Sequence, residues 1–567
     1  MTKLDTFPKN SFFADEVDLK EVFTVEDFTD EHKMIAQTTK DFVEQDVMPV
    51  LPKIENQEFE ESKKLIKQSG DLGLLGPDIP EEFGGLGLDK VSSIVITEQM
   101  AKTRSFVVTY SGQVGIGSLP IVYYGTDEQK AAYLPSVAAG EKIGSYALTE
   151  PDAGTDALGI KTTAKLSEDG THYILNGEKQ FITNASFADF FILYAKIDGE
   201  KFTAFIIDRD TEGLSIGPEE QKMGLKGSST TPVILNDVKV PVENVLGEIG
   251  RGHSIAFNIL NIGRHKISAT CLGTAKRALE LAVAHATERK QFKRPLAEFS
   301  LIKEKIADMV LKIFAMECMV YRTAGEFEKG ARYCEENNLP FLKILKNYAV
   351  ECSANKVYAS EALDAVVDEA LQIHGGYGYV NEYEIETLYR DSRINRIFEG
   401  TNEINRMVIA NTLLSEDGFP AVKKMKGELT GRFERQWNFA ERLRELTNTL
   451  VRDVKANFTS PDEEQELLAA IADLATASFA LESALIRTEK IFAGKAGKKA
   501  EQYERIVKVL AEVIATDVLQ KGLTVAGNMS AEFKQQLTEV FQQQNNSEIN
   551  LVEEKRKIAD TVISSGY

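Results

Sequence analysis

The spacing of apolar residues changes twice along this chain. Residues 30 to about 145 are spaced mostly as in helices. From about 146 to 250 there are short β-branched and aromatic runs, such as FFILYAKI (190–197), separated by Gly, Asn and Asp, which is typical of an all-β unit. Beyond that point the three- and four-residue spacing of long amphipathic helices returns, as in Leu272, Ala275, Leu279, Ala282 and Ala286.

A break at SEDGFP (415–420) separates these helices from a further helical block, in which Leu467, Ile471 and Leu474 keep the same rhythm. GQVGIG (112–117) lacks the glycine spacing of a dinucleotide fingerprint, and we interpret it as a small-residue helical stretch. The pattern predicts an α+β fold, mostly α, with four domains: 1–145 (helical), 146–250 (β), 251–415 (helical bundle) and 416–567 (extra helical domain).

Composition narrows the class of protein. The chain has 567 residues, 43% of them hydrophobic, and a net charge of −21, which argues against a nucleic-acid partner. Its four cysteines form no CxxC pair, so they indicate neither a zinc site nor a disulfide framework and fit a reducing compartment. The first ten residues have no apolar run, and no apolar run reaches about 18 residues. We therefore expect no secretory signal, no membrane span and a cytoplasmic (bacterial) or other reducing location.

One carboxylate stands out by its neighbours. In RINRIFEGTNEINRM (393–407), Glu399 follows the apolar pair Ile397 and Phe398 and precedes a Gly-Thr turn. Apolar surroundings disfavour a charged carboxylate and raise its pKa toward the working pH, which suits a general base. The alternative is a surface or helix-capping glutamate, because most glutamates are exposed.

Three loops have the composition of a ligand site. SYALTEPDAGTDA (145–157) can present backbone N–H groups and hydroxyls, and NGEKQFITN (176–184) offers an aromatic face and a hydroxyl. In QIHGGYGYVNEY (372–383) the paired glycines allow close approach of the backbone to a ligand. Taken singly, each loop is explained equally well as a strand-to-loop turn, a core aromatic or a helix C-cap.

Their order along the chain is more specific. Together with KMGLKGSST (222–230), VPVENVLGEIGRG (240–252), ATERKQF (286–292) and IFEGTNEI (397–404), these segments resemble the acyl-CoA dehydrogenase family over roughly residues 30–415. The block after residue 415 is similar to that of the very-long-chain branch. The resemblance implies an N-terminal helical domain, a central β-barrel-like domain, a four-helix bundle and an added C-terminal helical domain.

The resemblance also implies an FAD enzyme that introduces a trans double bond between Cα and Cβ of an acyl-CoA thioester in fatty-acid β-oxidation. Glu399 would be the catalytic base, and Gly263 occupies the place where some relatives carry an alternative one. Electron-transfer flavoprotein would be the electron acceptor. The implied FAD contacts are Leu148, Thr149, Thr155, Phe181, Thr183, Arg289, Gln291, Phe292, Gln372, Gly375, Gly376, Thr401 and Glu403.

Two groups among these residues carry further implications. Arg289, Gln291 and Phe292, with Gln372, Gly375 and Gly376, would hold the adenosine-diphosphate half of a neighbouring subunit's FAD, which implies a homodimer. Thr155, Asn261, Arg264 and Gly400 would contact the acyl-CoA, and Val108 and Gly112 would lie where medium-chain relatives close the acyl pocket. A glycine there leaves the channel open and predicts long acyl chains.

Rival functions are also open at this point. An acyl-CoA oxidase would share the flavin and the base but pass electrons to oxygen. A DNA-binding relative of this fold would require a basic face, which the net charge of −21 disfavours. In the extra domain, Lys423, Lys424 and Lys426 form one basic cluster and Lys495, Lys498 and Lys499 another. They allow weak membrane-surface association, although a solvated helical domain is the simpler interpretation.

Overall fold

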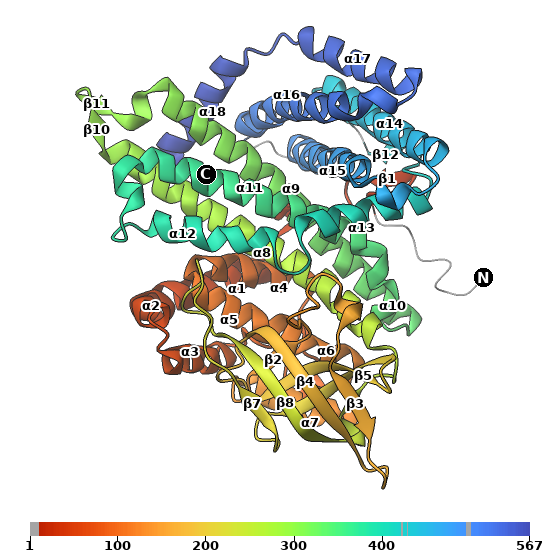
Figure 1. Cartoon of the computed structure of the whole chain (residues 1–567). Coiled ribbons are helices and arrows are strands. Elements are labelled where there is room, and N and C mark those ends of the chain that lie inside the picture. Colours follow the sequence, from red (N-terminus) through yellow and green to blue (C-terminus); the bar gives the residue numbers. More distant parts are fainter. Residues whose placement is uncertain (1–10, 421–422, 428, 495–499) are drawn as a thin grey trace. The chain divides into compact units, whose positions relative to one another are not determined.

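The computed structural model describes residues 11–420, 423–427, 429–494 and 500–567, which fall into two compact units (Figure 1). One unit comprises residues 29–270. The other comprises the described residues of the N-terminal segment up to Phe28 together with those from Cys271 to the C-terminus.

The unit of residues 29–270 begins with helices packed around a core that includes Phe42, Leu65, Phe106 and Tyr110. Between α5 and α6 the helix is interrupted by a π-helical turn, Gln113–Gly117, so the small-residue stretch is helical but not regular. The helices are α1 (Asp30–Phe42), α2 (Met48–Glu55), α3 (Phe59–Asp71), α4 (Lys90–Met100), α5 (Ser105–Gly112), α6 (Leu119–Tyr124) and α7 (Asp127–Ala138).

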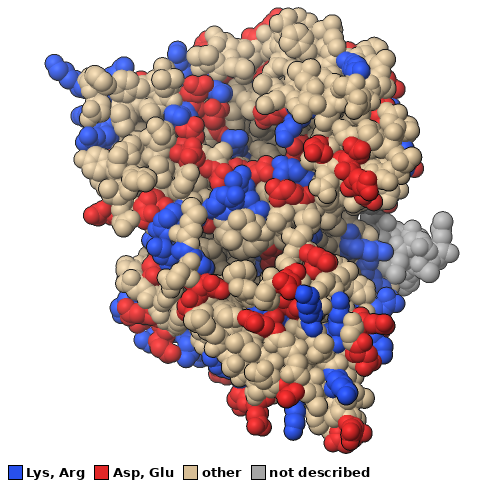
Figure 2. Space-filling model, viewed as in Figure 1, with Lys and Arg blue, Asp and Glu red and all other residues tan. Residues whose placement is uncertain are grey.

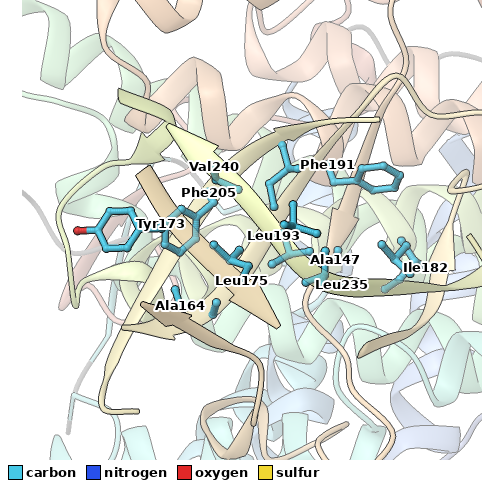
Figure 3. Packing of buried hydrophobic residues seen from close by; sticks show 14 of the residues in the cluster. Ala147, Ala164, Tyr173, Leu175, Ile182, Phe191, Leu193, Phe205, Leu235 and Val240 are labelled. Atoms are coloured by element: carbon cyan, nitrogen blue, oxygen red, sulfur yellow. The ribbon is translucent and has the colours of Figure 1, made fainter. Parts of the chain in front are cut away.

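The same unit continues into an eight-stranded sheet of order β7-β8-β4-β3-β5-β6-β9, with β2 paired to β5. Alternating apolar residues of neighbouring strands, such as Leu175, Leu193, Phe205 and Leu235, pack together on one side (Figure 3). The strands are β2 (Gly144–Ala147), β3 (Thr163–Leu166), β4 (His172–Thr183), β5 (Phe190–Ile197), β6 (Lys201–Asp208), β7 (Leu214–Ile216), β8 (Thr230–Pro241) and β9 (Val245–Leu246).

Helix α8 (Gly252–Glu288) runs from the unit of residues 29–270 into the other unit, which begins again at Cys271. The other unit is helical, and after α8 it has a short hairpin of β10 (Lys290–Gln291) and β11 (Arg294–Pro295). The bundle and the extra block share one core rather than forming separate bodies. Their helices are α9 (Ser300–Asn337), α10 (Leu342–Leu345), α11 (Ala349–His374), α12 (Glu384–Ser392), α13 (Asn402–Ser415), α14 (Glu434–Asn457), α15 (Gln465–Ala493), α16 (Ala500–Val525), α17 (Ala531–Asn545) and α18 (Leu551–Ser565).

A buried charge network joins the bundle to the extra block. The carboxylate of Glu482 on α15 accepts from Arg322 on α9 at 2.6 Å, from Arg444 on α14 at 2.9 Å and from Lys423 at 2.5 Å. All four side chains are at most 7% exposed. Lys423 is therefore an internal ion-pair partner rather than part of a basic surface cluster, and Lys495, Lys498 and Lys499 lie outside the described residues.

The N-terminal segment does not join the first helical domain, in contrast to the expected domain 1–145. Strand β1 (Glu16–Asp18) pairs in parallel with β12 (Lys424–Lys426), which lies more than 400 residues later in the sequence. Phe12 contacts Phe419 and Phe479 at ring-centroid distances of 4.8 and 4.7 Å. A local sequence pattern cannot predict this pairing, because it depends on which segments, distant in the sequence, pack together.

Among the residues that the structure describes, two segments have the length and mean hydropathy of a membrane span. They are Ser105–Tyr124 and Gln465–Ala493, and 78% and 83% of their apolar windows are buried within the protein. Such burial is the pattern of core helices. On the visible face of the described residues, acidic and basic side chains are interspersed, without a continuous basic stripe (Figure 2).

Candidate active site and cofactor surfaces

Glu399 lies in a short loop before α13, in a conformation that ordinary residues avoid. Its φ is +54° and that of Gly400 is +82°. A left-handed backbone is unfavourable for a side chain with a Cβ atom, and such strain is typical of functional sites. The Glu399 side chain is half-buried, next to half-buried Phe398 and exposed Ile397. Thr401 then caps α13 by accepting from the N–H of Ile404 at 3.3 Å.

A buried lysine holds this loop, and sequence reasoning missed it. Lys356, fully buried on α11, donates to the Gly400 carbonyl at 2.7 Å and to Asn402 Oδ1 at 2.8 Å. Asn405 Nδ2 also donates to the Gly400 carbonyl at 2.9 Å. These bonds fix the peptide between Gly400 and Thr401, one residue beyond Glu399. The available signal was a lysine within the apolar helical stretch SANKVYAS, since a buried lysine needs partners.

On the other unit, a bulge in β4 presents Phe181. This residue has φ +59° and is 58% exposed, an unusual state for a phenylalanine within a sheet. The ladder is irregular between Lys179 and Ile182. The N–H of Gln180 donates to the Thr149 carbonyl at 2.8 Å, and Ser145 Oγ donates to the Thr183 carbonyl at 2.6 Å.

The bulge and the loop after β2 therefore lie side by side, as the predicted roles of Leu148, Thr149, Phe181 and Thr183 require. Leu148 is buried, Thr149 and Thr183 are half-buried, and Thr155 lies further along the loop and is exposed. Phe181 and Thr183 offer an aromatic face and a hydroxyl, a combination that fits a flat heteroaromatic ring such as isoalloxazine.

A buried ion pair lies next to the surface formed by the β4 bulge and the loop after β2. Lys179 Nζ donates to Glu150 at 2.6 Å and to the Leu148 carbonyl at 3.2 Å. Burial lowers the pKa of Lys179 to about 8, although Glu150 opposes the shift. The pair was not predicted, because the two residues lie in different motifs and are brought together only by the tertiary structure.

The third group forms a pocket of about 470 Å³ at the end of α11. Arg289 and Gln291 line it together with Gly375 and Gly376, and a Cβ atom built on either glycine would meet no described atom within 4 Å. The rings of His285 and His374 stack at 4.4 Å, and the Arg289 guanidinium lies 5.2 Å from the ring of Tyr377. A guanidinium, an amide and accessible backbone suit phosphate oxygens, and the rings suit a base.

The remaining predicted residues are placed as follows. Asn261 and Arg264 on α8 are buried and bond to each other, with Arg264 Nη1 donating to Asn261 Oδ1 at 2.8 Å. Phe292, at the tip of the β10–β11 hairpin, is 88% exposed. Gln372 and Glu403 are exposed on α11 and α13.

The two acyl-pocket positions behave differently. Val108 is half-buried on α5. Gly112 faces no open space, since a Cβ atom there would lie 2.9 Å from Asn184 Nδ2. The glycine at this position permits close packing against the sheet.

The helical and β layers, the Glu399 loop and two surfaces that suit aromatic rings are consistent with a flavin-dependent oxidoreductase. Family models of acyl-CoA dehydrogenase match most of the chain: the N-terminal domain at residues 29–141, the middle domain at 145–238, and two C-terminal domain models at 250–414 and 454–555.

Individual relatives agree with these matches. A probable acyl-CoA dehydrogenase of Bacillus subtilis (strain 168) is 52% identical over 519 residues, 87% of this chain and 86% of the relative. The crystal structure of an acyl-CoA dehydrogenase complexed with FAD from Bacillus anthracis has a TM-score of 0.93 at 46% identity, covering 99% of both chains. The caffeyl-CoA reductase-Etf complex subunit CarC of Acetobacterium woodii is 38% identical over 395 residues, 69% of this chain and all of the relative.

The chain belongs to the acyl-CoA dehydrogenase family. The family consists of FAD-dependent oxidoreductases that act on acyl-CoA thioesters, and the predicted family, fold class, cofactor and enzyme class are confirmed.

Proposed function

We propose that the protein is a long-chain acyl-CoA dehydrogenase of fatty-acid β-oxidation, in which Glu399 removes the α-proton of the thioester and trans-2-enoyl-CoA is the product. The observation that carries this proposal is the Glu399 loop, held in a left-handed conformation by Lys356 and Asn405. When bound, FAD supplies the acceptor for the hydride that leaves Cβ.

The chemistry explains why the loop must be rigid. The α-proton of a thioester is a weak acid, so its removal needs a base at a fixed distance and donors for the developing enolate oxygen. A half-buried carboxylate on a pinned backbone meets the first need. The N–H of Glu399 itself is a candidate for one of the donors, because it lies in the same short loop that Lys356 and Asn405 anchor at the Gly400 carbonyl.

A direct test uses the colour of the purified protein. Adding palmitoyl-CoA without oxygen should bleach the flavin absorbance, and readmitted air should restore it slowly. Fast reoxidation with peroxide formation would instead indicate an oxidase. Electron-transfer flavoprotein is the proposed acceptor, in keeping with a relative named as a subunit of a reductase-Etf complex.

Replacing Lys356 by methionine should slow turnover without unfolding the enzyme. The change removes two hydrogen bonds to the Glu399–Asn402 loop while keeping an apolar chain of similar length. Misplacing a catalytic group costs up to about a hundredfold, so we expect kcat to fall roughly ten- to a hundredfold with a smaller change in KM. Ser360→Ala is the matched control, because Ser360 bonds to Asn402 but not to Gly400. Equal kcat in Lys356→Met and wild type would contradict the assigned role.

The exposed pocket at the end of α11 supports a homodimer. Arg289, Gln291, Gly375 and Gly376 are solvent-exposed, and exposed Phe292 and Tyr379, at 88% and 86%, occur in the adjoining segments. Exposed aromatic residues beside an anion-binding pocket fit a surface that receives the adenosine-diphosphate part of FAD from a second copy of this chain.

Arg289→Ala should therefore weaken FAD retention. A charge-assisted bond to phosphate contributes about 1.5–3 kcal/mol, so the FAD dissociation constant should rise roughly ten- to a hundredfold by ultrafiltration or fluorescence. Lys290→Ala, in the neighbouring exposed position outside the pocket, should retain FAD. A wild-type monomer by light scattering with full FAD occupancy would contradict the shared site.

We expect the preferred acyl-chain length to be set by α5 and the π-turn, which form the proposed far end of the acyl pocket. Gly115 is buried, yet a Cβ atom built there would meet no described atom within 4 Å. Because each buried methylene contributes about 0.8 kcal/mol, kcat/KM should rise with chain length to an optimum at about 14 carbons or longer.

The test measures kcat/KM from butyryl-CoA to eicosanoyl-CoA. Gly115→Leu should cost activity on palmitoyl-CoA and spare octanoyl-CoA. Gly112→Ala is the comparison, since it disturbs Asn184 and should affect all lengths alike. A wild-type optimum at octanoyl-CoA or shorter would refute the long-chain preference.

A further inference from the structure

The π-turn of residues 113–117 is closely packed at its two ends, near Gly112 and Gly117, and borders open space at Gly115. A Cβ atom on Gly112 would lie 2.9 Å from Asn184, and one on Gly117 would lie 2.7 Å from the Gly112 carbonyl oxygen. Gln113 anchors the turn to β2, because its Oε1 accepts from the N–H of Gly144 at 2.8 Å. Between these fixed points, Gly115 alone of the three glycines borders open space among the described atoms.

The π-turn changes the donor at the Val114 carbonyl. In an uninterrupted α-helix the N–H of Ser118 would bond to the Val114 carbonyl, but here it donates to the Gly115 carbonyl. Lys266 on α8 donates its ammonium to the Val114 carbonyl at 3.1 Å. Buried carbonyls need donors, and Lys266 gives the Val114 carbonyl a donor in place of the Ser118 N–H.

Lys266 is itself held in place. It is 4% exposed, and its ammonium lies 3.0 Å from Asp78 Oδ2. Asp78 also accepts from Lys90 at 2.9 Å and from Ser93 at 2.8 Å. Although burial alone would raise it, the neighbouring Lys266 and Lys90 hold the pKa of Asp78 well below its usual range. The carboxylate therefore stays charged and fixes the direction of the Lys266 side chain.

We propose that Lys266, oriented by Asp78, is a positioning residue for the far end of the acyl pocket. By holding the Val114 carbonyl in the π-turn, it keeps the space beside Gly115 open for the last methylenes of a long acyl chain. The inference rests on the proposed long-chain dehydrogenase function. It assigns the preference for long acyl chains to the buried ion pair of Lys266 and Asp78.

The experiment compares the ratio of kcat/KM for palmitoyl-CoA to that for octanoyl-CoA in FAD-loaded enzymes. Lys266→Met should lower this ratio about four- to fifteenfold, equivalent to one or two buried methylenes, and Lys266→Arg should restore much of it. Tyr110→Phe is the matched control, because it removes another buried bond from the same helix, Tyr110 Oη to the Leu74 carbonyl at 2.6 Å. The control should lower the melting temperature without changing the ratio.

An unchanged ratio in a folded Lys266→Met enzyme would overturn this inference while leaving the long-chain preference of the wild type intact. A wild-type optimum at octanoyl-CoA or shorter would instead overturn the proposed function, and this inference with it. If Lys266→Met does not fold, Gly115→Ala tests the premise of this inference, that the space beside Gly115 receives the acyl chain, since its methyl enters that space. A lowered palmitoyl-to-octanoyl ratio supports the open pocket, and an unchanged ratio overturns it.

Discussion

Glu399→Gln is expected to keep FAD and to bind acyl-CoA, yet to lose flavin reduction. The amide is nearly isosteric with the carboxylate but cannot accept the α-proton at neutral pH. General-base catalysis typically contributes about 10²–10⁴-fold, and because the loop is pinned at Gly400 by Lys356 and Asn405, we expect at least that loss. Anaerobic stopped-flow reduction by palmitoyl-CoA measures the effect.

The matched control is Glu416→Gln, an exposed glutamate just after α13. It should reduce its flavin at the wild-type rate. If Glu399→Gln reduces its flavin within a few-fold of wild type, Glu399 is not the base and the proposed mechanism is wrong.

Glu482→Gln should cause a large loss of stability. The substitution preserves shape but leaves Arg322, Arg444 and Lys423 around a neutral amide in the interior. Removing one partner of a buried ion pair costs about 3–5 kcal/mol, because the remaining charges stay desolvated. We expect a clearly lower midpoint of thermal or denaturant unfolding, with the N-terminal segment becoming sensitive to protease, since Lys423 and Arg444 also bind the Phe12 carbonyl.

Glu504→Gln gives the comparison for an ion pair near the surface. Glu504 lies 3.5 Å from Arg432, whose side chain is 54% exposed. Pairs of this kind contribute about 0–1 kcal/mol, so the midpoint should hardly move. Similar midpoints for Glu482→Gln and Glu504→Gln would show that the buried network does not stabilise this unit.

Many residues of the candidate site could be recognised from local sequence patterns. Paired glycines after α11, an aromatic-hydroxyl pair in β4 and an acid before a Gly-Thr turn were all visible in the sequence, and the structure places each on an accessible loop or bulge. Their roles toward FAD and substrate remain predictions. The change from helical to alternating and back to helical periodicity also predicted the order of helices and strands, because side-chain direction follows backbone period.

The sequence by itself determined the order of the helices and strands, and it singled out three candidate ligand loops and one candidate base. The tertiary structure alone decided which buried charges meet. Lys266 and Asp78 are 188 residues apart, Arg322 and Glu482 160, and Lys356 reaches a carbonyl 44 residues away. The physical reason is that periodicity is set by near neighbours along the chain, whereas a buried charge is tolerated only where packing brings a distant partner within hydrogen-bonding distance.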